Sequence, residues 1–141
     1  MQTFLPYTDF AKCAQTLDRL RLGKQRIEVL TILRTLLDGK KGWHNHPAVK
    51  MWSGYEQALV RYGIAMCQEW RRRGYKDTTQ PKIEAFLVHK SWQLPHWVGG
   101  KIHRTHQSNL LRKDYKYYRR FFLSVPLDLA YYWPRGQQYE R

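Results

Sequence analysis

Apolar residues recur along the chain at intervals of three and four, the spacing of one buried face of an α-helix. The clearest case is LRLGKQRIEVLTILRTLLDG, residues 20–39, where Ile27, Leu30, Leu33 and Leu37 share one side and Gly39 stands where a helix usually stops. No convincing alternation of polar and apolar positions stands out, so no strand is predicted. The pattern therefore predicts an all-α fold.

A first helix is expected to begin after a cap supplied by Thr8 or Asp9 and to run to about Leu20. Its inward residues are Phe10, Cys13 and Leu17. The longest helical pattern is HNHPAVKMWSGYEQALVRYGIAMCQEWRRRGY, which Asn45 or His46 can cap and Gly74 ends. Its predicted core residues are Val49, Trp52, Tyr55, Leu59, Tyr62 and Ala65.

The rest of the chain reads as shorter elements. Residues 77–87 predict a short capped helix, residues 91–100 a loop rich in Trp, Pro and Gly, and residues 101–122 a basic, aromatic helix or a pair of short helices. The segment from residue 133 onward is irregular. We therefore expect one compact domain over residues 1–141, a bundle of about three main helices plus short ones.

Composition places the chain among globular proteins, because 43% of its 141 residues are hydrophobic. No run approaches 18 apolar residues and no signal peptide is present, so no membrane partner is expected. Cys13 and Cys67 fall in apolar helical contexts and are predicted to be reduced core residues. These features favour a cytoplasmic monomer.

Charge changes the picture most. Lys and Arg number 25 against 11 acids, which gives a net charge of +14. A folded domain with this excess favours a polyanionic partner, and nucleic acid is the leading candidate, which would associate the protein with the nucleoid. The 6 Trp, 10 Tyr and 5 Phe supply surfaces on which bases stack. A basic surface that only confers solubility is the alternative.

Candidate chemistry is limited by what the chain lacks. WHNHP places His44 and His46 two apart, which keeps a histidine-based metal nuclease as an alternative, but no cysteine pair has zinc spacing. We therefore expect no metal and no cofactor. Because both thiols are predicted to be buried and the acids are scattered along the chain, an amine is the remaining candidate for a nucleophile. An α-amino group has a reference pKa near 7.7–8.0 and is far more often free base at neutral pH than a lysine. The bulky Gln2 should discourage removal of Met1, and MQTFLPY turns apolar at once, as if the terminus were anchored.

Glu28 is unusual because it stands in a strongly apolar helix. Lys24 and Arg21 lie one and two turns before it, and Thr31 and Thr35 lie after it on the same face. We expect the two cations to keep Glu28 ionised by lowering its pKa. A plain surface ion pair with Lys24 is the structural alternative.

Five segments in order resemble the pyrimidine-dimer DNA glycosylase family, the endonuclease V-like enzymes. They are LDRLRLGKQRIEVLTIL, WHNHPAV, RRRGYKDTT, LPHWVGG and LLRKDYKYY, and they span most of the chain. The resemblance implies a three-helix, all-α protein with glycosylase and AP-lyase activity. It also implies that the Met1 α-amine is the nucleophile and that Glu28 is the catalytic carboxylate.

The resemblance further implies double-stranded DNA with a damaged or modified base as the substrate. The predicted DNA-binding residues are Gln2, Arg19, Arg21, Lys24, Gln25, Arg26, His44, Asn45, His46, Arg104, His106, Lys113, Lys116 and Arg119. Ile27 and Thr31 stand where the family has basic residues, so the excised base stays open: a pyrimidine dimer, another lesion or a hypermodified phage base. The biological role, repair or anti-phage defence, is open too. A DNA- or RNA-binding module without catalysis is the competing function.

Overall fold

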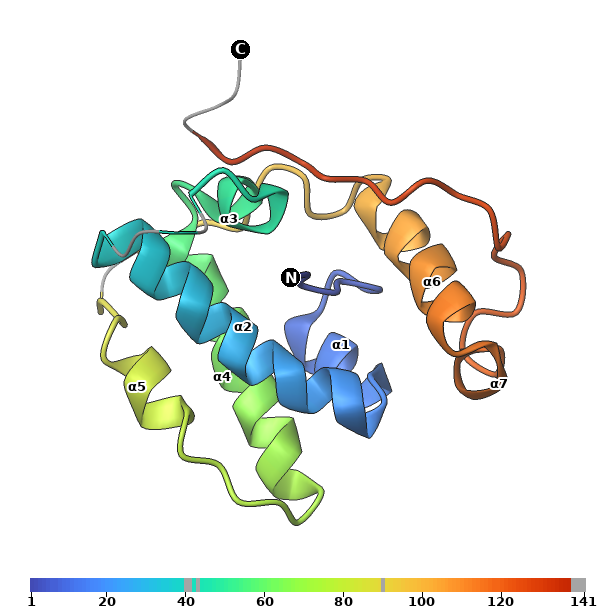
Figure 1. Cartoon of the computed structure of the whole chain (residues 1–141), viewed down its shortest axis with the longest axis horizontal. Helices are drawn as coiled ribbons and strands as arrows, with labels where there is room; N and C mark the ends of the chain where they lie inside the picture. The colour runs from blue at the N-terminus through green and yellow to red at the C-terminus, as the bar shows by residue number, and fades with distance from the viewer. Residues whose placement is uncertain (40–41, 43, 90, 138–141) are drawn as a thin grey trace.

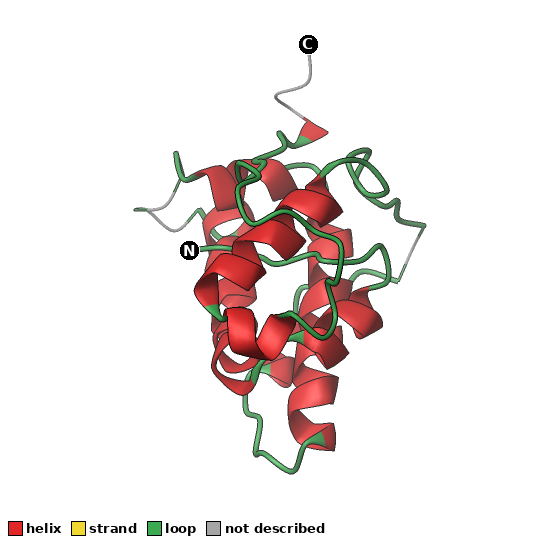
Figure 2. Cartoon of the chain, turned by 90° about the vertical axis from the view of Figure 1, so that its right-hand side faces the viewer, coloured by secondary structure: helices red, strands yellow, loops and turns green. Residues whose placement is uncertain are grey.

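A computed structural model describes residues 1–39, 42, 44–89 and 91–137, and this part of the chain contains helices and loops but no strand (Figure 2). The helices are α1 (Phe10–Thr16), α2 (Arg19–Leu37), α3 (Pro47–Trp52), α4 (Glu56–Arg72), α5 (Gln80–Glu84), α6 (Ile102–Lys113) and α7 (Tyr115–Tyr118). The all-α prediction is confirmed. Within the described residues, no helix combines the length and the apolar character needed to cross a membrane.

Helices α2 and α4 form the centre of the bundle, with α1 and α5 packed against α4 (Figure 1). Gly63 on α4 allows the close approach of α2, because a Cβ atom there would lie 2.6 Å from Val29 Cγ1. Both cysteines are buried and free, as predicted. The core between the two helices contains Leu22, Val29 and Leu33 from α2 and Leu59, Tyr62 and Met66 from α4.

The predicted first helix is wrong at its end. Helix α1 stops at Thr16, Leu17 is extended, and Asp18 starts α2 with a side chain that accepts from the Arg21 backbone N–H. Asp9 supplies the cap of α1, as one of the two predicted alternatives. The break arises because an aspartate after Leu17 offers the backbone a new helix start, a stronger local preference than continuing the apolar pattern.

The single long helix predicted from residue 46 to Gly74 is also wrong. His46 caps α3 as expected, but α3 ends at Trp52 and α4 begins at Glu56. Gly54 between them has a φ of +84°, a left-handed conformation that stops a helix. For residues 101–122 the sequence left one helix or a pair of short helices open, and the structure has two helices, with the break at Asp114.

Half of the residues predicted to form the buried face of α2 are buried. Leu30 and Leu33 are buried, whereas Ile27 is 52% exposed and Leu37 is 47% exposed. The true buried face is rotated toward Leu22, Gln25 and Val29. On α4, Ala65 is only half-buried, although the other core residues predicted for residues 46–74 are buried.

Both ends of the described chain pack against the bundle. The N-terminus lies between α2 and α6 in Figure 1, and residues 3–6 are buried. The segment after α7 returns past α6 to α3 (Figure 1), where the Gly136 N–H donates to Lys50 O at 2.8 Å. Midway, Tyr131 stacks on the buried His106 ring with the centroids 4.2 Å apart. Both ends are therefore part of the packed structure.

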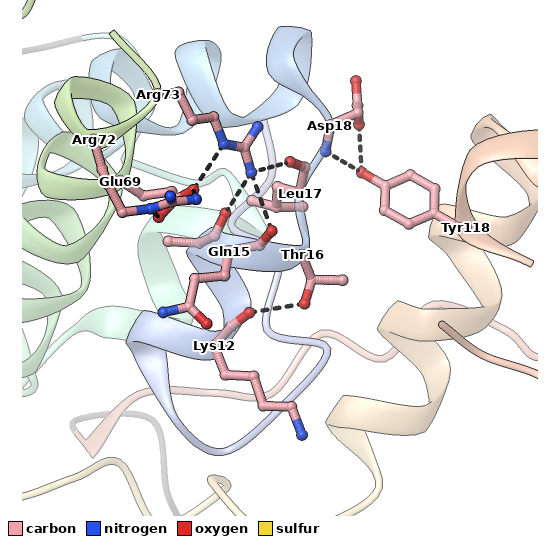
Figure 3. A network of polar contacts seen from close by, with 10 residues as sticks. Lys12, Gln15, Thr16, Leu17, Asp18, Glu69, Arg72, Arg73 and Tyr118 are labelled. Carbon is pink, nitrogen blue, oxygen red and sulfur yellow. Dashed lines mark hydrogen bonds and ion pairs between the residues drawn. The ribbon is translucent and has the colours of Figure 1, made fainter. Parts of the chain in front are cut away.

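A polar network fixes the start of α2 (Figure 3). Arg73, at the end of α4, bonds Glu69 at 2.8 Å and donates through Nη2 to three carbonyls at the end of α1, with Leu17 O the nearest at 2.7 Å. The Tyr118 hydroxyl donates to the Asp18 carboxylate and accepts from the Asp18 N–H at 2.9 Å. Helix ends leave carbonyls unpaired, and Arg73 satisfies those of α1. The network therefore anchors the helix that carries Glu28.

Candidate active site

Glu28 lies in the middle of α2 and faces the N-terminal segment. Its Oε2 atom accepts hydrogen bonds from the Gln2 backbone N–H at 3.2 Å and from Gln25 Nε2 at 3.1 Å. Glu28 and Lys24 both belong to the described part of the chain, and they form no ion pair. A surface ion pair with Lys24 is therefore not what holds the Glu28 carboxylate. The carboxylate is instead held against the first residues of the chain.

Gln25 is the centre of this arrangement and is 1% exposed. Its Nε2 donates to Gln2 O at 2.9 Å as well as to Glu28, and its Oε1 accepts from the Phe4 N–H at 3.0 Å. The Tyr62 hydroxyl lies 2.7 Å from both Gln25 Oε1 and Phe4 O. One side chain on α2 thus joins the N-terminal segment, Glu28 and α4.

A cleft of about 500 Å³ opens beside these groups. The cleft is lined by Met1, Gln2, Phe4, Leu20, Arg21, Lys24, Gln25, Glu28 and Lys113. Lys113 comes from the last turn of α6, so two distant parts of the chain supply cations to the same opening. The cleft therefore combines the Met1 end of the chain, a carboxylate and three cationic side chains, which suits a negatively charged ligand.

Burial raises the pKa of the Glu28 carboxyl above its ordinary value. The hydrogen bond from Gln2, the charges of the Met1 amine and Lys24, and the hydrogen bond from Gln25 oppose this shift without cancelling it. The expected net lowering by Arg21 and Lys24 is therefore wrong, because desolvation outweighs Lys24 and because Arg21 pairs with Asp18 at 3.2 Å. A carboxyl with a raised pKa changes its protonation state more readily near neutral pH.

Three predicted DNA-binding residues occupy structural positions instead. Gln25 has all its polar atoms engaged inside the protein. Arg26 is paired with Asp77 and lies over the Trp70 ring, 4.4 Å from its centroid. His106 is fully buried, where it accepts from the Leu5 N–H at 3.0 Å and burial lowers its pKa to about 3. A neutral buried imidazole cannot contact a phosphate.

The other predicted DNA contacts fall into three sets. Gln2, Arg21, Lys24 and Lys113 line the cleft. His46 uses Nδ1 to cap α3 at 3.0 Å, and its pKa is lowered by burial and by the nearby α-amine. The remaining predicted residues are exposed: Arg19 on α2, His44 and Asn45 on the loop before α3, Arg104 on α6, Lys116 on α7 and Arg119 directly after α7.

A second hollow of about 440 Å³ lies on α2 and shares Leu20, Lys24 and Glu28 with the cleft. Trp70 forms part of it and approaches Gly23, where a Cβ atom would meet the ring at 3.0 Å. The sequence predicted Tyr62 only as a core residue and assigned Trp70 no role, so neither was expected near Glu28. The spacing of three between Gln25 and Glu28 was the available sign that these side chains meet on one face.

Comparison with known families adds an independent result. A family model described as pyrimidine dimer DNA glycosylase matches residues 1–82. This region runs from Met1 through α4 and contains Glu28, Gln25 and Tyr62. No curated protein and no solved structure matches the chain.

Proposed function

Because the chain belongs to the pyrimidine dimer DNA glycosylase family, we propose that this DNA glycosylase releases its target base through the Met1 α-amine and the Glu28 carboxylate. The observation that carries the proposal is the placement of Glu28 against the N-terminal segment, with Oε2 3.2 Å from the Gln2 nitrogen. The α-amine lies one residue from that contact, in the same cleft. Met1, which carries the proposed nucleophile, and Glu28 thus line the same cleft.

Base release is the first step. As the bond between C1′ and the base nitrogen breaks, the base departs with the electron pair and the sugar gains oxocarbenium character. The ionised Glu28 carboxylate stabilises this positive charge. The amine nitrogen bonds to C1′ and loses a proton, for which Glu28 is an acceptor, and the departing base takes up a proton from water or from Glu28.

A lyase step follows from the same intermediate. The bond between C1′ and O4′ opens to give an iminium, with O4′ taking up a proton. Loss of a proton from C2′ then expels the 3′ phosphate, which breaks the strand. Glu28, with its raised pKa, is the group in the cleft that suits repeated proton transfer.

DNA positioning falls to the cations around the opening. Lys24 and Lys113 line the cleft from α2 and α6, and the exposed Lys116 and Arg119 lie on α7 and directly after it. Cations of this kind contact phosphates and fix the register of the duplex without reading its sequence. The net charge of +14 is consistent with this role.

The first substrate to test is duplex DNA with a pyrimidine dimer. Ile27 and Thr31 replace basic residues of the family pattern, and Ile27 lines the apolar hollow beside Glu28. Duplexes with oxidised, alkylated or hypermodified bases therefore belong in the same panel. The identity of the released base would also distinguish a role in DNA repair from a role in defence against phage.

Borohydride trapping tests the proposal directly. Borohydride reduces a Schiff base to a stable amine, so the protein becomes covalently fixed to substrate DNA. Peptide mapping should find the DNA on the fragment that begins with Met1, and acetylation of the α-amine should abolish the adduct. The same mapping identifies which residue carries the free amine, because removal of Met1 would place the Gln2 amine 3.2 Å from Glu28.

Lys24 and Lys113 are the matched controls, since both lysines line the cleft. Lys24→Gln and Lys113→Gln should weaken DNA binding but still give the adduct at the terminus. DNA attached to either lysine would overturn the assignment of the nucleophile. Binding without any adduct or base release across the panel would instead favour the non-catalytic module. In the described part of the chain, no three His, Cys, Asp or Glu side chains gather to hold a metal, and loss of strand cleavage on addition of EDTA would be the result that favours the metal nuclease.

A further inference from the structure

We propose that Gln25 is a positioning residue, which fixes the geometry between the N-terminal segment and the Glu28 carboxylate. This inference rests on the proposed function, because it assigns Gln25 a part in base release without contact with DNA. The side chain is 1% exposed and stands one helical turn before Glu28. It would therefore act through Glu28 and through the segment that carries the amine.

The amide of Gln25 is fully used. Its two N–H groups donate to Gln2 O at 2.9 Å and Glu28 Oε2 at 3.1 Å, and its oxygen faces the Phe4 N–H at 3.0 Å and the Tyr62 hydroxyl at 2.7 Å. A primary amide offers two donors and an acceptor with two lone pairs. Few other side chains can bond all of these partners, because a carboxylate has no N–H donor and an apolar side chain has neither donor nor acceptor.

The contacts of Gln25 form two closed rings, one with Gln2 and Glu28 and the other with Phe4 and Tyr62. Gln2 bonds Glu28 through its N–H and Gln25 through its carbonyl, and Gln25 bonds Glu28 directly. Phe4 and Tyr62 hold the other end of the same amide. A shift of the N-terminal segment would break several bonds at once, which is how buried polar networks confer rigidity. Preorganisation of this kind matters because small displacements of reacting groups slow catalysis strongly.

The same amide also acts on the charge of the carboxylate. The Gln25 N–H stabilises the ionised form of Glu28 and so lowers its pKa, against the larger effect of burial. Other titratable or charged groups that act on Glu28 or line its cleft are the Met1 amine, Arg21, Lys24, Tyr62, Lys113 and Tyr131. A substitution at Gln25 replaces none of these groups, so a change in the titration of Glu28 would report the loss of the Gln25 amide and of the contacts that it holds.

Two substitutions test the role. Gln25→Met keeps the length of the side chain and removes every hydrogen bond. Gln25→Glu keeps the shape and the oxygen facing Phe4 and Tyr62, but replaces the donor to Glu28 with a second carboxyl. Both should raise the pKa of Glu28, the first by loss of a donor and the second by like-charge repulsion. Carbon-13 titration of the Glu28 carboxyl measures this without DNA.

The expected functional result is a loss that depends on pH. Single-turnover base release should slow by roughly 10- to 100-fold near neutral pH, because a misplacement of about 1 Å between reacting groups can cost about 100-fold in rate. The acidic limb of the pH–rate profile should move to higher pH, and the loss should shrink as pH rises because Glu28 ionises again. DNA affinity should be unchanged.

Gln107→Met is the matched control. Gln107 also ties the N-terminal segment through its amide, by donating to Pro6 O at 2.6 Å, but its hydrogen bond does not involve Glu28. This variant should keep the wild-type pH profile. An equal loss at every pH in the Gln25 variants, with weakened DNA binding, would overturn the positioning role.

Glu28→Gln, measured in parallel, separates the two hypotheses. Full base release by Glu28→Gln would overturn the proposed function itself. An inactive Glu28→Gln together with wild-type rate and pH profile in both Gln25 variants would overturn only the inference about Gln25.

Discussion

Replacement of Glu28 by Gln should separate activity from stability. The substitution keeps the size of the side chain and one oxygen, which can still accept from the Gln2 N–H and from Gln25 Nε2. It removes the negative charge, and it adds an NH₂ group that faces the open cleft. The fold should therefore tolerate the change, whereas base release should not.

The sign of the stability effect follows from the raised pKa of Glu28. A carboxyl whose pKa is higher in the folded state destabilises the fold once it ionises, so its penalty is absent in acid and develops as pH rises through that pKa. Glutamine never ionises. Glu28→Gln should lose no more than about 1 kcal/mol, the net worth of one hydrogen bond. Its stability relative to the wild type should improve between pH 4 and pH 7.

The activity effect is expected to be larger. Loss of a well-placed group that stabilises developing charge costs about 10²- to 10³-fold in rate, or roughly 2.7–4.1 kcal/mol of transition-state stabilisation. Single-turnover base release, urea unfolding at two pH values and anisotropy with duplex DNA measure the three quantities. Wild-type base release would refute the catalytic role, and a loss of several kcal/mol in unfolding free energy would mark Glu28 as a structural partner.

Further predictions concern binding and the anchor of α2. Lys24→Gln and Lys113→Gln should each reduce the slope of log affinity against log salt by about 0.9, and an affinity that barely changes with salt would contradict the electrostatic reading. Arg73→Met should lower the unfolding free energy by about 2–4 kcal/mol in urea titrations, because three carbonyls at the end of α1 lose a charged donor. An unchanged unfolding midpoint would show that water replaces the guanidinium. The pKa of Glu69 is lowered by Arg72 and then Arg73, so the stability of this cluster should be lost as pH falls through that lowered pKa, and Glu69→Gln should remove this acid dependence.

The sequence allowed the fold class and the main helices to be predicted, but not where the helices break. Asp18 and Gly54 interrupt patterns whose apolar spacing continues across them, because capping and backbone conformation are local preferences that periodicity does not register. The exposure of Ile27 has a tertiary cause, since α4 packs on the opposite face of α2 and Gly63 sets that contact.

For the candidate site, the placement of Glu28 beside the N-terminal segment agrees with the expectation from the resemblance, while its roles in chemistry stay predictions. The direction of the Glu28 pKa shift was predicted wrongly, because a sequence shows the spacing of charged residues but not the burial of the carboxyl. His106 shows the same limit. A histidine in a basic stretch suggests a DNA contact, yet the ring lies under Tyr131, which is 25 residues away in the chain.

The buried N-terminal segment also bears on how the protein is made. Leu5 bonds His106, which is synthesised 101 residues later, and the Tyr131 ring that packs edge-on against Phe4 follows later still. At about 5–20 residues per second, the ribosome needs roughly 5–20 s to supply the His106 partner. During that interval the first residues lack the contacts that enclose them. Enzymes that trim or acylate new chains therefore meet this terminus before residues 3–6 are buried.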